Sequence, residues 1–100
     1  MKLDRNGYRS SLFNTEDGFC YIHKDYCQTV RHEVLPGMNR SLSKKYGLWI
    51  NVCPSCHNMS DHSIHSDPES YEYLKAEAQE LFEQEYPEED FMAVFGKNYL

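Results

Sequence analysis

The chain has 100 residues, enough for one domain with a modest core, and its 40 % hydrophobic content is typical of a folded protein. No apolar run approaches the ~20 residues of a membrane span, and the N-terminus lacks an apolar secretion signal, so we expect a cytoplasmic protein without membrane contact. Cytoplasmic thiols stay reduced, so the four cysteines favour metal binding. Two disulfides in a secreted domain are the alternative.

The net charge of −6 is unevenly distributed along the chain. Residues 1–65 contain eight Lys/Arg and six Asp/Glu, a net of +2, whereas residues 66–100 contain two Lys and ten Asp/Glu, a net of −8. An acidic surface repels a phosphate backbone, so we expect residues 66–100 to face away from any nucleic acid.

The predicted elements are those of an α+β protein. Residues 1–18 are polar, contain two turn signals and predict no defined element. Strands are predicted at residues 19–22, 29–35 and 48–52, the second ended by Pro36-Gly37, and short helices at 41–46 and 53–59. Asp67-Pro68 is a typical start for an amphipathic helix that runs to about Tyr86, where Pro87 breaks it. A short helix over 88–95 ends at Gly96.

These elements predict three parts in one domain. Residues 1–18 form an N-terminal polar segment, 19–66 form the core that carries the Cys and His motifs, and 67–100 form an acidic helical extension that packs on that core.

Two short pairs of soft ligands predict a structural zinc site. Cys20 and His23 form the first pair, Cys53 and Cys56 the second, and 29 residues separate the two pairs. Zinc takes four tetrahedral sulfur or nitrogen ligands in such sites, and the ion stabilises domains too small to hold their ends by core packing. Cys27 is a rival to His23 as the fourth ligand; its other interpretation is a free or buried thiol.

The remaining histidines predict a second, catalytic metal site. His32 and Glu33 combine a proton acceptor with a hard oxygen ligand, and His57 is fixed by its neighbour Cys56. A strand–loop–strand–helix order would bring residues 32, 33 and 57 to one surface. His65 is a weaker candidate, and His62 is weaker still, because isolated histidines are more often structural or merely exposed.

Two sequence strings resemble the HNH endonuclease family, in particular a small branch common in phage and bacterial genomes. The first is H-E-x3-G-x-N-R at residues 32–40, and the second is Y-G-L-x4-C-x2-C-H at residues 46–57. The similarity continues through Ile64-His65 and residues 91–100, so that it covers about residues 19–100. The two strings are specific together and only moderately specific alone.

The resemblance implies a zinc-stapled ββα-metal (His-Me finger) core with C-terminal helices, and hydrolysis of DNA phosphodiester bonds with one divalent ion. His32 would be the general base, and Glu33 a metal ligand or an alternative base. His57 and His65 would bind the catalytic ion, Mg²⁺ or another divalent metal, while Zn²⁺ is structural. Asn39 would supply a catalytic amide. DNA is the expected partner, with phage or bacterial proteins as further partners. Four basic residues would contact the DNA: Arg31, Arg40, Lys44 and Lys45.

The chain departs from the family pattern at two places. His23 replaces a cysteine that many relatives have, which leaves zinc chemistry intact. The central Asn of the general pattern lies about five residues before the second Cys pair, where this chain has Leu48. Asn39 is the substitute, although an ordinary turn Asn is an equally valid interpretation. The missing Asn and the net acidity favour the alternative function, a catalytically inactive zinc-stapled binding or adaptor module.

Overall fold

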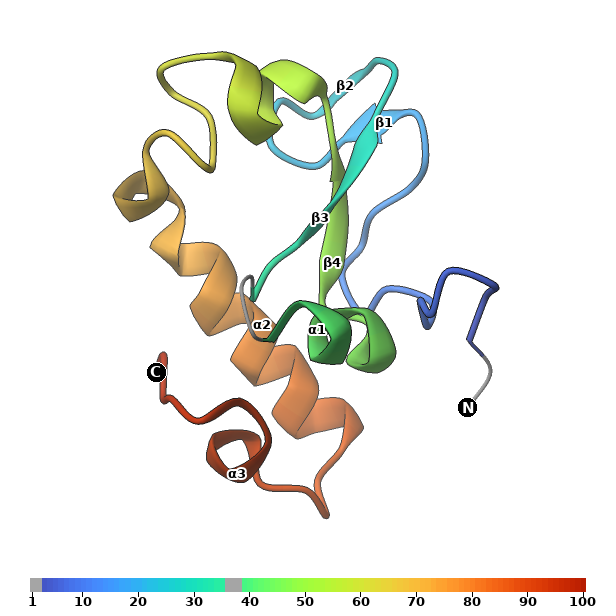
Figure 1. The fold of residues 1–100 in the computed structure, drawn as a ribbon, viewed down its shortest axis with the longest axis vertical. Helices are drawn as coiled ribbons and strands as arrows, with labels where there is room; N and C mark the ends of the chain where they lie inside the picture. The colour runs from blue at the N-terminus through green and yellow to red at the C-terminus, as the bar shows by residue number, and fades with distance from the viewer. Residues whose placement is uncertain (1–2, 36–38) are drawn as a thin grey trace.

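The computed structural model describes residues 3–35 and 39–100 as an α+β arrangement with two small antiparallel sheets (Figure 1). β1 (Phe19–Cys20) pairs with β2 (Asp25–Tyr26), and β3 (Val30–Glu33) pairs with β4 (Trp49–Val52). The Pro36-Gly37 strand end and the glycine of the first family string lie outside the described residues.

The β3–β4 hairpin is the centre of the molecule. His32 lies opposite Ile50, and Glu33 lies opposite Trp49. Every residue of β4 is buried, because helix α2 covers one side of the hairpin and the N-terminal segment contacts the other (Figure 1). Side chains of consecutive strand residues point to opposite faces, so His32 and Glu33 are directed to different sides of the sheet.

Helix α1 (Arg40–Tyr46) connects the two strands of this hairpin and ends at Gly47. Gly47 has φ 75°, the left-handed conformation that favours glycine at a helix end. A Cβ atom there would lie 2.5 Å from the Ser10 carbonyl oxygen, so the missing side chain also lets the N-terminal segment pass. Ser43, fully buried, donates to the Leu35 carbonyl and accepts from the Leu35 N–H, which ties α1 to the end of β3.

The C-terminal helices form the other end of the molecule (Figure 1). A 3₁₀ turn, η3 (Pro68–Tyr71), leads into α2 (Glu72–Glu85), and α3 (Phe91–Phe95) follows. Aromatic rings of this end and Tyr46 of α1 pack with ring centroids 4.7 to 6.0 Å apart, mostly edge to face. The cluster consists of Tyr46, Phe82, Tyr86, Phe91 and Phe95.

Most predicted elements are confirmed, with revised ends. The helix predicted at 53–59 is a five-residue π-helix, η2 (Ser55–Met59). The last helix begins later than predicted, because the Asp90 carboxylate accepts from the Met92 N–H and caps it there. β2 was not predicted, since both its residues are exposed and give no apolar signal.

The N-terminal segment has a defined place despite its polar composition. Phe13 is buried, and the Trp49 indole donates to the Arg9 carbonyl at 2.8 Å. Residues 67–100 contact the rest of the chain at points such as Tyr21, whose Oη donates to Glu77. No helix in the described part of the chain is long and apolar enough to cross a membrane.

Candidate metal centres

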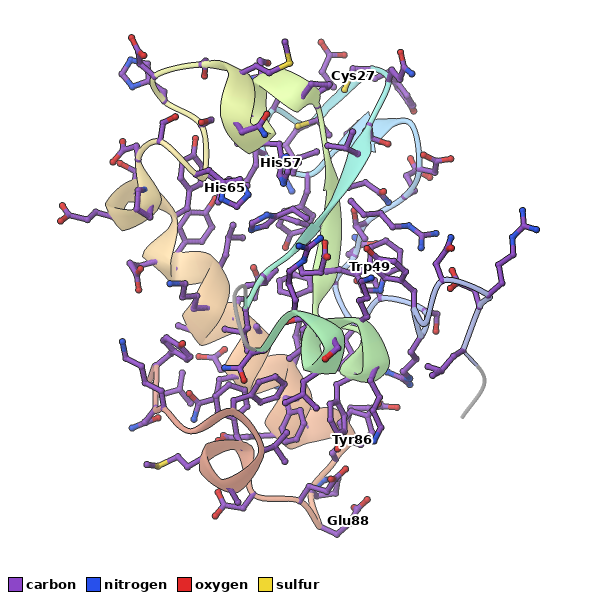
Figure 2. The ribbon with its side chains drawn as sticks, viewed as in Figure 1. Cys27, Trp49, His57, His65, Tyr86 and Glu88 are labelled. Carbon is purple, nitrogen blue, oxygen red and sulfur yellow. The ribbon has the colours of Figure 1, made fainter. Side chains whose placement is uncertain are left out.

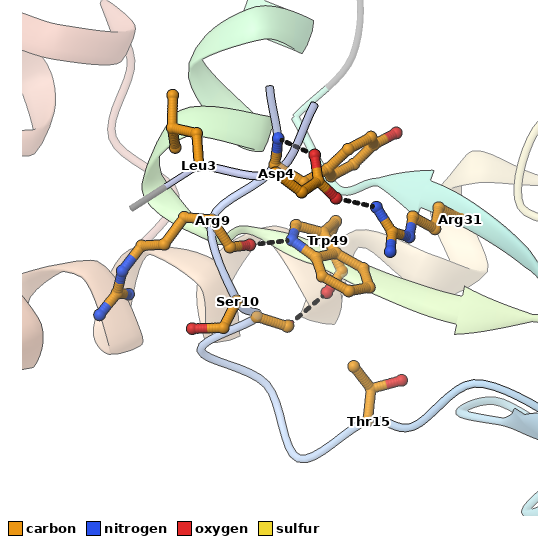
Figure 3. Close-up of a pocket in the computed structure, with 9 residues that line it drawn as sticks. Leu3, Asp4, Arg9, Ser10, Thr15, Arg31 and Trp49 are labelled. Carbon is orange, nitrogen blue, oxygen red and sulfur yellow. Dashed lines mark hydrogen bonds and ion pairs between the residues drawn. The ribbon is translucent and has the colours of Figure 1, made fainter. Parts of the chain in front are cut away.

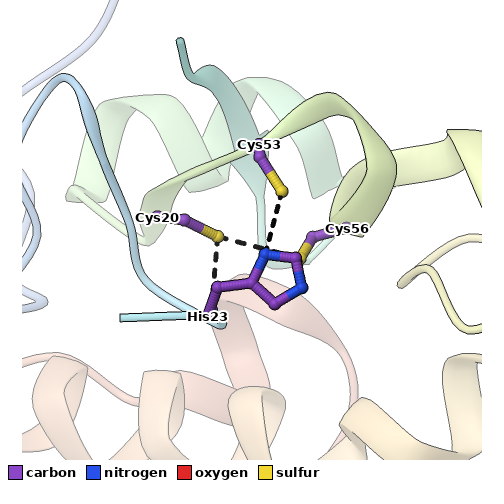
Figure 4. Close-up of side chains that lie close together, drawn as sticks. All are labelled: Cys20, His23, Cys53 and Cys56. Carbon is purple, nitrogen blue, oxygen red and sulfur yellow. Dashed lines mark hydrogen bonds between the residues drawn. The ribbon is translucent and has the colours of Figure 1, made fainter. Parts of the chain in front are cut away.

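Four side chains converge at the end of the molecule that holds both hairpin β1–β2 and η2 (Figure 4). Cys20 ends β1, and His23 lies in the turn between β1 and β2. Cys53 follows β4, and Cys56 lies within η2. Their ligand atoms all lie within 4.8 Å of one another, so this group could hold a metal ion such as zinc.

The distances within this group match a tetrahedral zinc site. Cys20 Sγ and Cys56 Sγ lie 3.7 Å apart. Zn–S bonds of about 2.3 Å at a tetrahedral angle give a sulfur separation of ~3.8 Å. His23 Nδ1 lies 3.2 Å from Cys53 Sγ and 3.4 Å from Cys56 Sγ. In addition, the His23 backbone N–H donates to Cys20 Sγ at 3.3 Å, a contact that stabilises a thiolate.

The thiols of this end differ in their readiness to ionise. Burial raises the pKa of Cys53, but hydrogen bonds from Ser55 and Cys56 outweigh that effect and lower it to about 6. Burial and the neighbouring thiols raise the pKa of Cys56. Cys27 lies near Cys53 but outside the four-residue group, and burial followed by the charges of Cys53 and Cys20 raises its pKa. The structure therefore brings together the predicted set with His23 rather than Cys27.

A second group consists of His32, His57 and His65, whose ligand nitrogens also lie within 4.8 Å of one another. His32 is buried on β3, His57 follows Cys56 in η2, and His65 comes from the loop after η2. Two backbone hydrogen bonds fold that loop back onto η2, from Ile64 to Cys56 and from His65 to His57. Figure 2 shows His57 and His65 beside each other, between the hairpin and the start of the helical extension.

The geometry and electrostatics of the three histidines suit a divalent ion. His57 Nε2 and His65 Nε2 lie 3.1 Å apart, and two nitrogens bound to one ion at about 2.0–2.1 Å would lie ~3 Å apart. Burial and the charges of His57 and His65 lower the pKa of His32 to about 3, and burial followed by His65 lowers that of His57. Both imidazoles are therefore neutral near pH ~7, the form that binds metals.

Glu33 lies outside the histidine group. Its Oε1 accepts from Arg40 Nε at 3.1 Å, and its side chain is only 8 % exposed. Its charge reaches His57, whose pKa it acts to raise. The structure thus places His32, predicted as the base, among the ligand nitrogens. It places Glu33, predicted as a ligand or an alternative base, in an ion pair outside that group.

Asn39 and the four predicted DNA-contacting residues lie on or next to α1 and β3, and Arg31 and Lys44 lie over the same Tyr8 ring. The Asn39 side-chain amide donates to the Phe95 carbonyl at 3.1 Å, a contact that joins the start of α1 to α3. Arg40 pairs with Glu33. Lys44 and Lys45 lie in the last turn of α1, where cations interact favourably with the helix dipole. The structure does not bring these residues together into one basic face with the histidines.

Arg31 lies where the N-terminal segment crosses the hairpin (Figure 3). Its guanidinium lies 4.4 Å from the Tyr8 ring centroid and 4.5 Å from that of Trp49, and it pairs with Asp4 at 3.1 Å. A hollow of about 560 Å³ lies beside these residues. Arg31 is two residues from Glu33 on β3 and thus faces away from His32.

The sequence did not indicate two residues that the structure places beside the histidines. A cavity of about 230 Å³ has His32 and His65 on its wall, and Tyr71 and Lys75 from η3 and α2 also line it. Lys75 lies within the acidic extension that was expected to face away from nucleic acid. The amphipathic pattern of α2 indicated that one face of this helix packs inward. It did not indicate which part of the chain that face contacts.

Comparisons with protein-family models, with curated proteins and with solved structures returned no match.

Proposed function

We propose that this chain is a metal-dependent DNA endonuclease of the HNH type, with a ββα-metal core formed by β3, β4 and η2. One observation carries the proposal: consecutive residues of η2, Cys56 and His57, belong to two different metal-ligating groups. A Cys/His group that is complete with four ligands is typical of a structural site, whereas three histidines leave a coordination position open for substrate or water.

A divalent ion at His32, His57 and His65 would supply Lewis-acid activation of water and stabilise charge on a phosphate. The three side chains come from a strand, a π-helix and a folded-back loop, so their positions depend on the whole core. Burial keeps His32 neutral and ready to bind, since protonation would cost the desolvation of a charged imidazole.

In this proposal His32 is a metal ligand and Glu33 is the proton acceptor, the second of the two roles that the sequence suggests for it. An imidazole that binds a metal through one nitrogen and carries hydrogen on the other has no lone pair left to accept a proton. The Glu33 carboxylate lies outside the group, but its charge reaches His57, and Arg40 holds it in place. Arg40 also has donors to spare for a phosphate oxygen.

Nicking of supercoiled plasmid in the presence of Mg²⁺, Mn²⁺ or Ni²⁺ tests the activity. We expect metal-dependent nicking by the native chain and a loss of about 100-fold or more in His57→Ala. His62→Ala is the matched control, because His62 is exposed and lies outside the group. Absence of nicking with all three ions would refute the proposal.

The assignment of roles has its own test. His32→Ala should weaken Ni²⁺ binding at the histidine group, measured by calorimetry on zinc-loaded protein. Glu33→Gln should preserve Ni²⁺ affinity and lower kcat by about 100-fold. If His32→Ala binds Ni²⁺ normally and Glu33→Gln cleaves normally, the base is His32 as the sequence alone suggests.

A specific observation favours the second candidate, an inactive zinc-stapled binding or adaptor module. Asn39, Arg31 and Arg40 all have partners within the chain, so none of them is committed to a ligand. Protein that binds one zinc and stays folded but nicks no plasmid under any of the three ions would support this candidate.

A further inference from the structure

The cavity beside the histidines is the feature from which a substrate preference can be inferred. It lies between β3, the loop over residues 60–66, and the start of the helical extension. His32 and His65 form part of its wall, so a molecule in the cavity contacts the proposed metal site directly.

The rest of the wall is apolar, with one aromatic ring and one cation. Val34, Ile64 and Leu74 are at most 7 % exposed and form the apolar lining. Tyr71 contributes its ring, and its hydroxyl is engaged with the His62 carbonyl, which fixes the ring in place. Such a lining suits a flat heterocycle and does not suit a chain of phosphates.

The size of the cavity limits its occupant to a single ring system. Its volume of about 230 Å³ is below the ~300–1,000 Å³ of pockets for drug-sized ligands. A base within a duplex is stacked and paired and cannot enter a cavity, whereas a base in a single strand, bulge or mismatch is free to do so.

Lys75 provides the charge that a nucleotide requires. Its ammonium lies 3.2 Å from Glu72 Oε1, and the two side chains are 26 % and 53 % exposed. Ion pairs this exposed contribute little, so Lys75 can exchange the Glu72 carboxylate for a phosphate. It is the one basic residue on the cavity wall apart from the histidines, as far as residues 3–35 and 39–100 show.

The charge of the surrounding surface supports the same conclusion. The extension that carries Lys75 has a net charge of −8 over residues 66–100. A duplex presents two phosphate strands and would meet this repulsion at many points. A single strand that places one base and one phosphate in the cavity would meet this repulsion at only a few points.

We propose that this cavity receives one unpaired nucleobase of a DNA strand, with its phosphate between Lys75 and the histidine group. The proposal rests on the proposed nuclease function and names its substrate: single-stranded or locally unpaired DNA. The Tyr71 ring stacks on the base, and Lys75 positions the phosphate.

Fluorescence anisotropy tests the proposed preference for unpaired DNA by measuring binding alone, without hydrolysis of the DNA. A short labelled single strand and the same strand annealed to its complement are titrated with zinc-loaded full-length protein, without added Mg²⁺ or Mn²⁺. We expect the single strand to bind about tenfold or more tightly than the duplex. Tyr71→Leu and Lys75→Met should each weaken single-strand binding by about fivefold or more. Lys97→Met makes the same charge change in the same acidic extension. Lys97 shares the Tyr99 ring with Lys75 but does not line the cavity, so this variant should weaken binding clearly less than Lys75→Met.

A second readout locates the base. A strand with 5-iodouracil at one position should crosslink to Tyr71 on irradiation, as identified by mass spectrometry of the digested protein. Equal or tighter duplex binding, or single-strand binding that neither variant weakens, would overturn the proposal. Because the assay needs no hydrolysis, its failure is distinct from an absence of plasmid nicking: a chain that nicks but shows no single-strand preference keeps its function and loses this substrate assignment.

Discussion

The two ends of this molecule are stabilised in different ways. The metal end, formed by β1, β2 and η2, has short strands, and both residues of β2 are exposed. The helical end has the aromatic cluster of Tyr46, Phe82, Tyr86, Phe91 and Phe95, with several rings almost completely buried. A 100-residue chain has too little apolar surface to build such a cluster twice.

The two ends therefore depend on different properties of their side chains. The helical end is specified by the volume and shape of apolar side chains, which a single truncation disrupts. The metal end is specified by four donor atoms, and a donor that is lost cannot be replaced by packing. Four predictions test this contrast.

Removal of zinc should have the largest effect. Structural zinc contributes on the order of 10 kcal/mol of apparent binding energy in small domains, which is comparable to the total stability of a typical domain. We expect chelation, or Cys20→Ser, to abolish hydrogen-exchange protection of the amides in β1, β2 and η2. Cys27→Ser is the control and should retain one zinc per chain. Unchanged protection of the Cys56 amide after chelation would show that packing alone holds this end.

Truncation of a side chain in the aromatic cluster should have the second-largest effect on stability. Phe82 is fully buried and contacts four other rings, so Phe82→Ala should lower the free energy of unfolding by about 3–5 kcal/mol. Urea unfolding of zinc-loaded protein measures this, and zinc content should stay unchanged. Tyr73→Ala, at a half-exposed position of the same helix, should cost within about 0.5 kcal/mol. A zinc loss in Phe82→Ala would mean that the two ends are not independent.

Ser43 lies where the hairpin meets the helices. Ser43→Ala leaves the buried N–H and carbonyl of Leu35 without their hydroxyl partner, which should cost about 1–3 kcal/mol. Thermal or urea unfolding measures the loss, and exposed Ser41→Ala serves as the comparison. Equal stability of the two variants would show that Leu35 finds other partners.

The smallest expected effect is a dependence of stability on pH at the histidine group. The folded pKa of His32, about 3, lies below the ordinary value of 6.5, so the unfolded chain binds more protons between these values. Stability therefore falls as pH decreases from about 6.5 toward 3, by at most ~2 kcal/mol at pH ~5 from this residue. The difference in pH slope between the native chain and His32→Gln, measured by urea unfolding, isolates it. Parallel slopes would show that His32 is not held neutral by burial.

The short-range features were predictable from the sequence. The pairs Cys20/His23 and Cys53/Cys56 have spacings that a turn can bring onto one ion, and the structure places all four together. Gly96 ends its helix as predicted, and Gly47 follows the helix predicted at 41–46; both have positive φ. Each of these inferences depends on residues a few positions apart, where chain geometry leaves few alternatives.

The features that the sequence did not reveal depend on long-range packing. Nothing near Lys75 in the sequence indicates that α2 would place it beside His32, because that contact depends on how the extension docks. The adjacent His32 and Glu33 were given roles from a pattern, but strand alternation sends them to different faces. The polar segment over residues 3–18 gave no prediction, because its position depends on contacts with the distant Trp49, made by the Arg9 carbonyl, the Ser11 hydroxyl and the Tyr8 ring.

The adjacency of Cys56 and His57 has a thermodynamic consequence. One turn of η2 orients Cys56 for the Cys/His group and His57 for the histidine group. Zinc bound by the Cys/His group would order that turn, which should raise the affinity of the histidine group for a divalent ion. By reciprocity, an ion at the histidines must strengthen zinc binding by the same factor. If both groups bind ions as proposed, the two affinities are coupled, and scarcity of one metal would lower the occupancy of the other site.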